Sequence, residues 1–160
     1  MSASLLRLHD SIVHRLTRAG WLGPLALRLV FGYFWAETGW AKLHNLDGFT
    51  ARFVDWGIPL PAFSATLSAG VEFVGGLLLM LGLFTRVTAA AMAFNMIVAI
   101  AFVVIKNVGG IDDFVELDEV LYVLVFFWLV MAGPGKASLD AWLARRLRVD
   151  ASAVPANAMR

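Results

Sequence analysis

The sequence predicts an all-α integral membrane protein, in which four transmembrane helices form an antiparallel bundle and shorter helices lie at its interfaces. Apolar residues make up 60% of the 160-residue chain, whereas soluble domains contain about 45 to 50%. These residues gather in four stretches that short polar segments join. In lipid every backbone polar group needs a partner within the protein, so such stretches form helices, and short loops make neighbouring helices antiparallel.

Charge and composition exclude several classes of function. The formal net charge is +1 and no basic stripe with interleaved aromatic residues occurs, so we expect no nucleic-acid partner. The chain has no cysteine, which excludes disulfides, thiolate metal sites and a dithiol relay. His9, His14 and His44 lie in the N-terminal arm or at a helix end, so no pair of intramembrane histidines can hold a haem. We expect no covalently bound cofactor.

We divide the chain into residues 1–20, 21–133 and 134–160. Residues 1–20 carry apolar side chains at helical spacing with arginines between them, which predicts an amphipathic helix on the cytoplasmic membrane surface. Residues 21–133 form the predicted transmembrane domain. Residues 134–160 form a cytoplasmic tail, whose segment SLDAWLARRLRV predicts a second amphipathic helix.

The first predicted crossing spans residues 21–43 and carries polar groups on two faces. At about 100° per residue, one stripe contains Arg28, Gly32, Trp35, Gly39 and Lys42, and the nearly opposite stripe contains Tyr33, Glu37, Trp40 and His44. This helix should therefore touch protein or water on both sides. Gly32 and Gly39 permit a second helix to approach closely.

A short helix between residues 45 and 61 is expected to lie in the outer interface. Asp47 is its candidate N-cap, and Gly57 with Pro59 ends it. Three aromatic side chains share one face: Phe49, Phe53 and Trp56.

The second crossing lies in the stretch from Pro61 to Arg86, before a short turn expected at Phe84 to Arg86. Between Pro61 and Arg86 it has one ionisable side chain, Glu72, near the middle of the membrane. A charge at that depth costs about 2.5 to 3.5 kcal/mol on insertion scales, so Glu72 must be protonated, paired or facing a wet cavity. The third crossing, Val87 to Ile105, has Asn95 at a similar depth.

An acidic loop, Lys106 to Asp118, precedes the fourth crossing. Asp113 and Glu116 have the spacing of a capping box, so this helix is expected to start there and to run to about Ala132, before Gly133-Pro134-Gly135. The loop acids could hold Ca²⁺, but they lack the EF-hand order and a solvated loop is favoured. The aromatic run 126–128 is expected to face lipid.

The distribution of basic residues predicts the orientation. Arginine and lysine are frequent in the N-terminal arm, at the turn with Arg86 and in the tail, and the opposite side is acidic. By the positive-inside rule both termini are cytoplasmic. The expected location is the inner (cytoplasmic) membrane of a bacterium, with several crossings.

Four segments resemble the DoxX family of small four-helix bacterial membrane proteins. They are RLVFGYFWAETGWAK (28–42), FVDWGIP (53–59), EFVGGLLLMLGLFTR (72–86) and GPGKASLD (133–140), and the resemblance covers about residues 22–143. It implies the four-helix fold. It also implies a quinone-linked redox setting, because DoxX-like proteins are known mostly as accessory membrane subunits linked to thiosulfate:quinone oxidoreductase or to oxidant-defence assemblies.

Glu72 is the candidate catalytic residue. It could pair with Arg28 or Lys42, or share a proton with Glu37. Either arrangement suits a quinone site, where a carboxyl exchanges the proton and an Arg or Asn polarises a carbonyl oxygen. The candidate ligand-binding residues are Arg28, Glu37, Lys42, Asn95, Tyr33, Trp35 and Trp40. Alternatively, Glu72, Arg28 and Asn95 only fix helix register through buried polar contacts.

Three functions are consistent with the sequence. The favoured one, because of the family, is a subunit of a quinone-linked oxidoreductase or oxidant-defence complex, which binds a quinone or another small hydrophobic ligand. The second is a small transporter or lipid-handling protein, and the third a membrane anchor or assembly scaffold without activity. We expect membrane lipids as neighbours, with a partner protein or a second copy of the chain.

Overall fold

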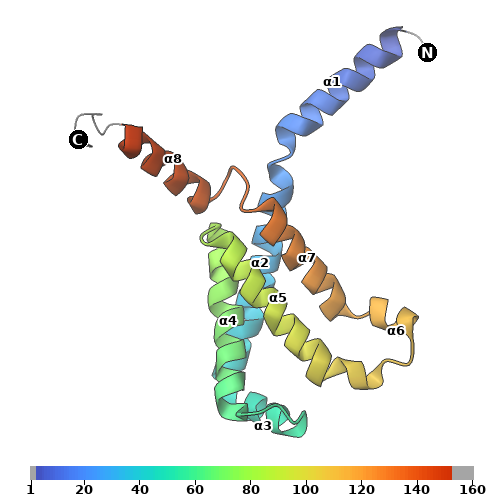
Figure 1. Ribbon diagram of the computed structural model, residues 1–160, viewed down its shortest axis with the longest axis vertical. Coiled ribbons are helices and arrows are strands. Elements are labelled where there is room, and N and C mark those ends of the chain that lie inside the picture. Colours follow the sequence, from blue (N-terminus) through green and yellow to red (C-terminus); the bar gives the residue numbers. More distant parts are fainter. Residues whose placement is uncertain (1–2, 153–160) are drawn as a thin grey trace, which may run out of the picture.

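The computed structural model describes the backbone of residues 3–152 and the side chains of residues 8–147. Within these ranges the chain forms helices joined by short turns and contains no strand (Figure 1), which confirms the all-α prediction. The helices are α1 (Ala3–Ala19), α2 (Leu22–His44), α3 (Leu46–Asp55), α4 (Pro61–Leu81), α5 (Thr85–Phe102), the 3₁₀ helix η1 (Val104–Asn107), α6 (Ile111–Val115), α7 (Asp118–Ala132) and α8 (Leu139–Ser152).

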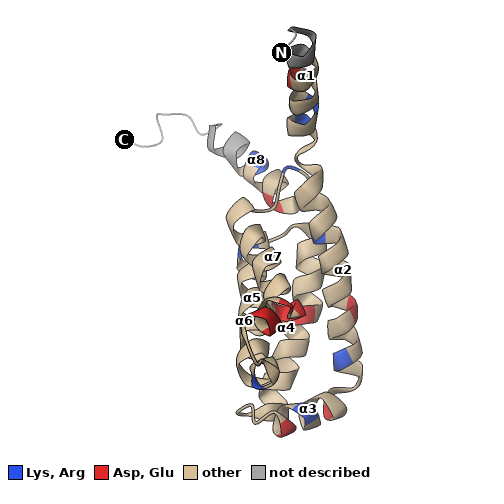
Figure 2. Cartoon of the chain, turned by 90° about the vertical axis from the view of Figure 1, so that its right-hand side faces the viewer, with Lys and Arg blue, Asp and Glu red and all other residues tan. Residues whose placement is uncertain are grey.

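The long helices form two antiparallel pairs. Helix α2 packs along α4, α5 packs along α7, and α4 and α5 contact each other. Figure 1 shows that the pairs meet near the α4–α5 turn and diverge toward α3 and α6. Helices α1 and α8 leave the molecule at the end where the pairs meet. Lys, Arg, Asp and Glu are few along the four long helices and more frequent in α1, α3 and α6 (Figure 2).

Glycines bring α2 and α4 into backbone contact. A Cβ atom at Gly39 would lie 2.3 Å from the Phe73 nitrogen, and one at Gly76 would lie 2.4 Å from the Ala36 nitrogen. No larger residue fits at either position without separating the helices. The predicted role of the α2 glycines in close packing is therefore confirmed.

The main core lies where all four long helices meet. Its buried members are Trp35, Leu79, Ala89, Met92, Met96, Phe126 and Leu129. Edge-to-face contacts join the aromatic rings of α2 and α7, with 6.4 Å between the ring centres of Phe31 and Phe126. The prediction that Phe126 faces lipid is therefore wrong, because its side chain points into the core, whereas Phe127 and Trp128 are exposed.

Two predicted capping positions are also wrong. Helix α3 begins at Leu46, so Asp47 lies in its first turn rather than at the cap. The capping box at Asp113 does not form, because Asp113 lies inside α6 and its carboxylate accepts a hydrogen bond from the Gly109 N–H at 2.8 Å. The chain is extended at Leu117, and α7 begins only at Asp118.

The helix ends that glycine sets lie closer to the positions predicted from the sequence. Helix α7 ends at Ala132, directly before Gly133. Helix α4 ends at Leu81, shortly before the turn predicted at Phe84 to Arg86, because Gly82 takes a left-handed conformation with φ of 65°. Among the described residues, two helices are long and apolar enough to cross a membrane, α4 and α5. Helix α2 carries three charged residues and α7 has only 15 residues.

Candidate functional site

Glu72 lies in the middle of α4 and is 1% exposed. The Lys42 ammonium of α2 lies 2.6 Å from each of its carboxylate oxygens. The Asn95 amide of α5 donates a hydrogen bond to Oε1 at 3.2 Å. Of the partners considered for Glu72, the structure therefore has Lys42. Within the described part of the chain, Glu72 has neither an ion pair with Arg28 nor a carboxyl–carboxyl hydrogen bond with Glu37.

The close contact of α2 with α4 explains this pairing. Gly39 lets α2 pack directly against the α4 backbone, and Lys42 lies about one turn later on the same face of α2. Its ammonium also lies 4.9 Å from the centre of the Phe49 ring of α3, a cation–π distance. A buried carboxylate needs such a partner, because an unpaired charge in an apolar interior costs several kcal/mol.

A cavity of about 640 Å³ opens beside the pair. It lies between α2, α4, α5 and α7, and α3 and η1 line it at the end where the helix pairs diverge. Its volume is within the range of about 300 to 1,000 Å³ typical of small-molecule sites. The polar side chains that line it are Thr38, Lys42, Ser64, Ser68, Glu72, Asn95, Glu119 and Tyr122, and most of the other lining residues are apolar.

Trp35 also lines the cavity, and its indole N–H is a hydrogen-bond donor without a partner among the described residues. The indole Nε1 is buried. The ring lies edge-to-face with Tyr122 of α7, 5.3 Å between ring centres. Buried donors without a partner are uncommon in native proteins and need an explanation, for example a ligand that the structure does not hold.

Sequence reasoning missed several cavity residues. Phe49 and Phe53 of α3 were expected at the interface, yet they line the cavity. Glu119 of α7 was considered only among the acids that could hold Ca²⁺, and Tyr122 of α7 was not considered. The aromatic face of the short helix was a signal for the first two, since an apolar face on an interfacial helix must cover something. No sequence signal marked Tyr122, which lies far along the chain.

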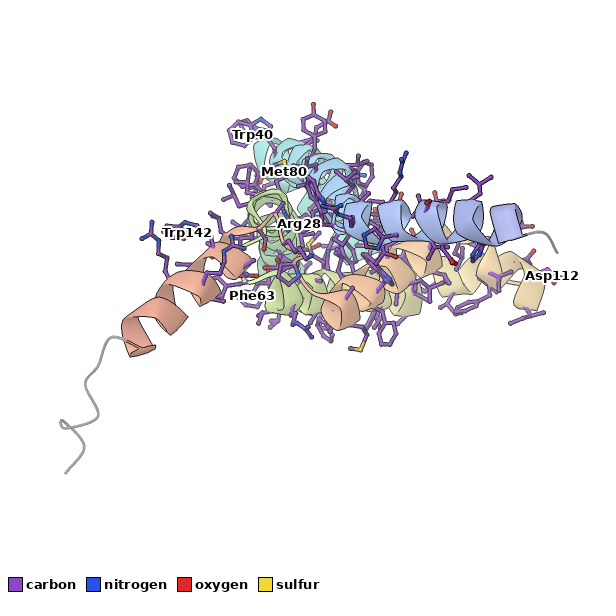
Figure 3. The ribbon with its side chains drawn as sticks, turned by 90° about the horizontal axis from the view of Figure 1, so that it is seen from above. Arg28, Trp40, Phe63, Met80, Asp112 and Trp142 are labelled. Atoms are coloured by element: carbon purple, nitrogen blue, oxygen red, sulfur yellow. The ribbon has the colours of Figure 1, made fainter. Side chains whose placement is uncertain are left out.

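Three candidate ligand-binding residues lie outside the cavity. Tyr33 is 64% exposed, Trp40 is 53% exposed and Glu37 is exposed between them on the outer side of α2. Figure 3 shows Trp40 at the periphery of the bundle, and its ring contacts the His44 ring at a tilt of 48°, with 4.0 Å between the ring centres. These residues form a common outer stripe, which is the second polar face predicted for this helix.

Arg28 is buried at the opposite end of α2 and is absent from the cavity lining. Its guanidinium donates to the backbone oxygens of Leu79 at 3.1 Å and Ala137 at 2.8 Å, and also to that of Pro134. In the view along the bundle, Arg28 lies among the helices and does not reach outward (Figure 3). Arg28 thus joins α4 to the segment that follows α7.

Asp140 strengthens the same junction. Its carboxylate accepts hydrogen bonds from the N–H groups of Phe84 and Thr85, at 2.8 and 2.9 Å, and so caps α5. Its own N–H donates to the Gly82 oxygen at 2.9 Å. We call Arg28 and Asp140, with the backbone groups they bind, the terminal clamp. The sequence signals for Asp140 were its place in the first turn of a predicted helix and at the end of the segment GPGKASLD (133–140), which resembles the family.

The acidic loop shows no metal-site geometry in the part of the chain that the structure describes. No group of three or more His, Asp or Glu side chains lies close enough together there to hold an ion. Asp112 lies at the far end of the view in Figure 3, away from the long-helix bundle.

The comparisons with known proteins agree on one family. The DoxX family model matches residues 23–105. The putative oxidoreductase CatD of Bacillus subtilis is 35% identical, covering 76% of this chain and 87% of that protein. An uncharacterized membrane protein of Mycobacterium tuberculosis is 31% identical over 76% of this chain and 82% of its own length. The inner membrane protein YqjF of Escherichia coli is 28% identical over 78% and 95%. No solved structure matches the chain.

Proposed function

The chain belongs to the DoxX family of membrane proteins, and we propose that it binds a quinone, or a similar small hydrophobic ligand, around Glu72. In this proposal it is an inner-membrane subunit of a quinone-linked oxidoreductase or oxidant-defence complex. Two relatives support the setting, since one is named a putative oxidoreductase and another an inner membrane protein.

One observation carries the proposal: a buried, paired carboxyl stands at the wall of a largely apolar cavity. Reduction of a quinone adds protons to its two oxygens, so its site needs a group that exchanges a proton and donors that hold the carbonyl. Glu72 can exchange the proton. Lys42 and Asn95 each keep an N–H that the contacts to Glu72 do not use. The electrons would come from a partner that carries the redox centre.

The proposed topology has four crossings, α2, α4, α5 and α7, with both termini in the cytoplasm. The charges of α2 are compatible with a crossing where they are paired, since backbone oxygens hold Arg28 and Glu72 holds Lys42. Helix α7 covers about 22 Å at 1.5 Å per residue and packs along α5. The basic residues of α1 and α8, at one end of the molecule, support the orientation.

The outer stripe of α2 supports a protein partner in the membrane. Glu37 is exposed about two turns from the end of a helix that crosses in this topology. A carboxyl facing lipid at that depth is unfavourable. The partner subunit, or a second copy of the chain, would cover Glu37 together with Tyr33 and Trp40.

A binding titration tests the ligand site. We expect purified protein in detergent to bind the tail-free naphthoquinone menadione, measured by calorimetry, and Glu72→Gln to weaken the binding about tenfold or more, because the Lys42 and Asn95 donors that would hold a quinone oxygen lose the carboxylate that positions them. Glu37→Gln makes the same chemical change outside the cavity and should bind as the wild type does. Equal affinity in all three proteins, each eluting as a folded species, would overturn the assignment of Glu72.

A further inference from the structure

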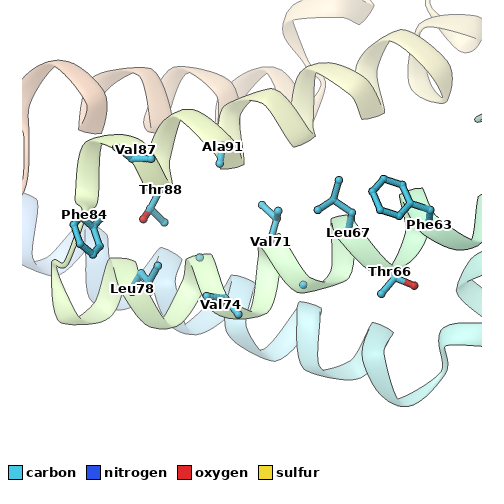
Figure 4. Close-up of a pocket in the computed structure, with 12 residues that line it drawn as sticks. Phe63, Thr66, Leu67, Val71, Val74, Leu78, Phe84, Val87, Thr88 and Ala91 are labelled. Carbon is cyan, nitrogen blue, oxygen red and sulfur yellow. The ribbon is translucent and has the colours of Figure 1, made fainter.

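A second hollow runs along the outer side of α4 and α5. It has a volume of about 620 Å³, and Figure 4 shows the residues that line it. On α4 it extends from Phe63 to Leu78, which is about 22 Å at 1.5 Å per residue. On α5 it extends from Val87 to Ala91, and Phe84 lies at one end. We call it the lateral groove.

The lateral groove is almost wholly apolar. Its only side chains with polar atoms are Thr66 and Thr88. The Thr66 hydroxyl donates to the Ala62 oxygen at 2.8 Å, and Thr88 is buried. The groove also lies between the two helices that, among the described residues, are apolar enough to cross a membrane. Its chemistry therefore suits a hydrocarbon chain.

The groove and the cavity beside Glu72 adjoin each other. Leu67, Val71 and Ala91 line both. Figure 4 shows Val71 of α4 pointing toward α5, where Ala91 lies. These three side chains therefore lie at the boundary of the two spaces, and the Ala91 side chain is a single methyl group. Glu72 directly follows Val71 in α4. The carboxyl that lines the cavity therefore comes from the residue next to this boundary.

We propose that the two spaces hold one molecule, a lipid-soluble quinone with a long tail. Its head lies beside Glu72, Lys42 and Asn95, and its tail passes between Leu67, Val71 and Ala91 into the lateral groove. This inference rests on the proposed function and narrows the ligand class from any quinone to a tailed one. A ligand bound in this way enters from the bilayer through the space between α4 and α5.

Gly70 allows the groove to be filled without disturbing the fold. It lines the groove, and a Cβ atom built on it meets no atom within 4 Å. Gly70→Leu therefore places a side chain in the groove and creates no backbone clash. Gly23→Leu is the matched control, because a Cβ there also meets nothing and Gly23 lines neither space.

The test compares menadione with a geranyl-tailed menaquinone, which has the same naphthoquinone head. Each is titrated in one detergent into the wild type, Gly70→Leu and Gly23→Leu. We expect Gly70→Leu to weaken binding of the tailed probe about tenfold, since it removes burial of roughly two carbon groups. Menadione binding should stay within about twofold, and Gly23→Leu should change neither affinity.

The outcomes separate this inference from the proposed function. If Gly70→Leu binds the tailed probe as tightly as the wild type does, the tail lies elsewhere and the inference is wrong. Menadione binding that still depends on Glu72 would leave the proposed function standing in that case. If the wild type binds neither probe, both proposals fail.

Discussion

At the scale of single residues, the charges of α2 show two ways of holding a cation inside an apolar bundle. Lys42 pairs with a carboxylate that an amide also contacts. Among the described residues, Arg28 has no acid in hydrogen-bond contact, and it donates to backbone oxygens instead. The planar guanidinium can reach several carbonyls at once, whereas an ammonium is a compact point charge. Each residue type thus fits the partners it has.

The Glu72–Lys42 pair leads to a stability prediction. Lys42→Met should lower the free energy of unfolding by about 3 kcal/mol, because breaking a buried pair leaves a buried charge without compensation. The double variant Lys42→Met/Glu72→Gln should regain most of the lost free energy of unfolding, because it no longer contains the unpaired Glu72 carboxylate. Unfolding of the three variants in denaturant, followed by circular dichroism, measures both effects. Strictly additive losses would show that the two side chains are not coupled.

The residues of the pair could be predicted from the sequence only in part. Hydropathy placed Glu72 and Asn95 at mid-depth, and the structure brings them within 3.2 Å. The choice between Arg28 and Lys42 was open, because they share one stripe of α2 and are separated by 14 positions, about 21 Å. Periodicity assigns a face to a residue, but the axial offset of two packed helices depends on contacts such as those at Gly39.

At the scale of the elements, the contact of α2 with α4 depends on small residues. Without a hydrophobic driving force between helices in lipid, association depends on close van der Waals packing. Gly32, Gly39 and Gly76 provide it, since any of them with a Cβ would meet the other helix at under 3 Å. This contact also sets the position of Lys42 relative to Glu72.

Gly76→Ala should therefore destabilise the protein by about 1 to 3 kcal/mol, the usual cost of overpacking. Gly70→Ala is the control on the same helix, where an added Cβ meets nothing, and it should be neutral or slightly stabilising. Thermal unfolding in detergent compares the two variants. A Gly76→Ala variant as stable as the Gly70→Ala variant would contradict the packing described here.

The end of a helix could be predicted where a glycine fixes the backbone conformation. It could not be predicted where a polar side chain can bond any of several backbone groups. Gly133 ends α7 as expected. Asp113 has the spacing of a capping residue, but its carboxylate binds the Gly109 N–H instead. Short polar side chains can bond several nearby backbone groups, so spacing alone does not decide which one they take.

At the scale of the whole molecule, the two helix pairs are fastened at one end and diverge at the other. The terminal clamp joins α2, the α4–α5 turn and the segment before α8. The cavity lies toward the diverging end, where α3 contributes part of its wall. The terminal clamp thus holds the two helix pairs together at one end, and the proposed ligand site lies toward the end where they diverge.

This arrangement was the part least accessible to sequence reasoning. The helices could be predicted from the apolar stretches and from the glycines and prolines that end them. The clamp depends on hydrogen bonds between residues 51 to 109 positions apart, such as those of Arg28. Arg28 was a ligand-binding candidate because it is an ionisable residue within a predicted crossing. Its contacts in the structure are instead with backbone oxygens of distant segments.

The central claim is that a quinone binds in the cavity beside Glu72 and depends on that residue, and one measurement tests it most directly. The protein is purified gently from its own membranes and analysed by native mass spectrometry, with lipid extraction of the same sample, as wild type, Glu72→Gln and Glu37→Gln. The account predicts a stoichiometric quinone in the wild type and in Glu37→Gln, and its loss from Glu72→Gln. Ordinary phospholipids alone in the wild type, or the same quinone content in all three proteins, would contradict it.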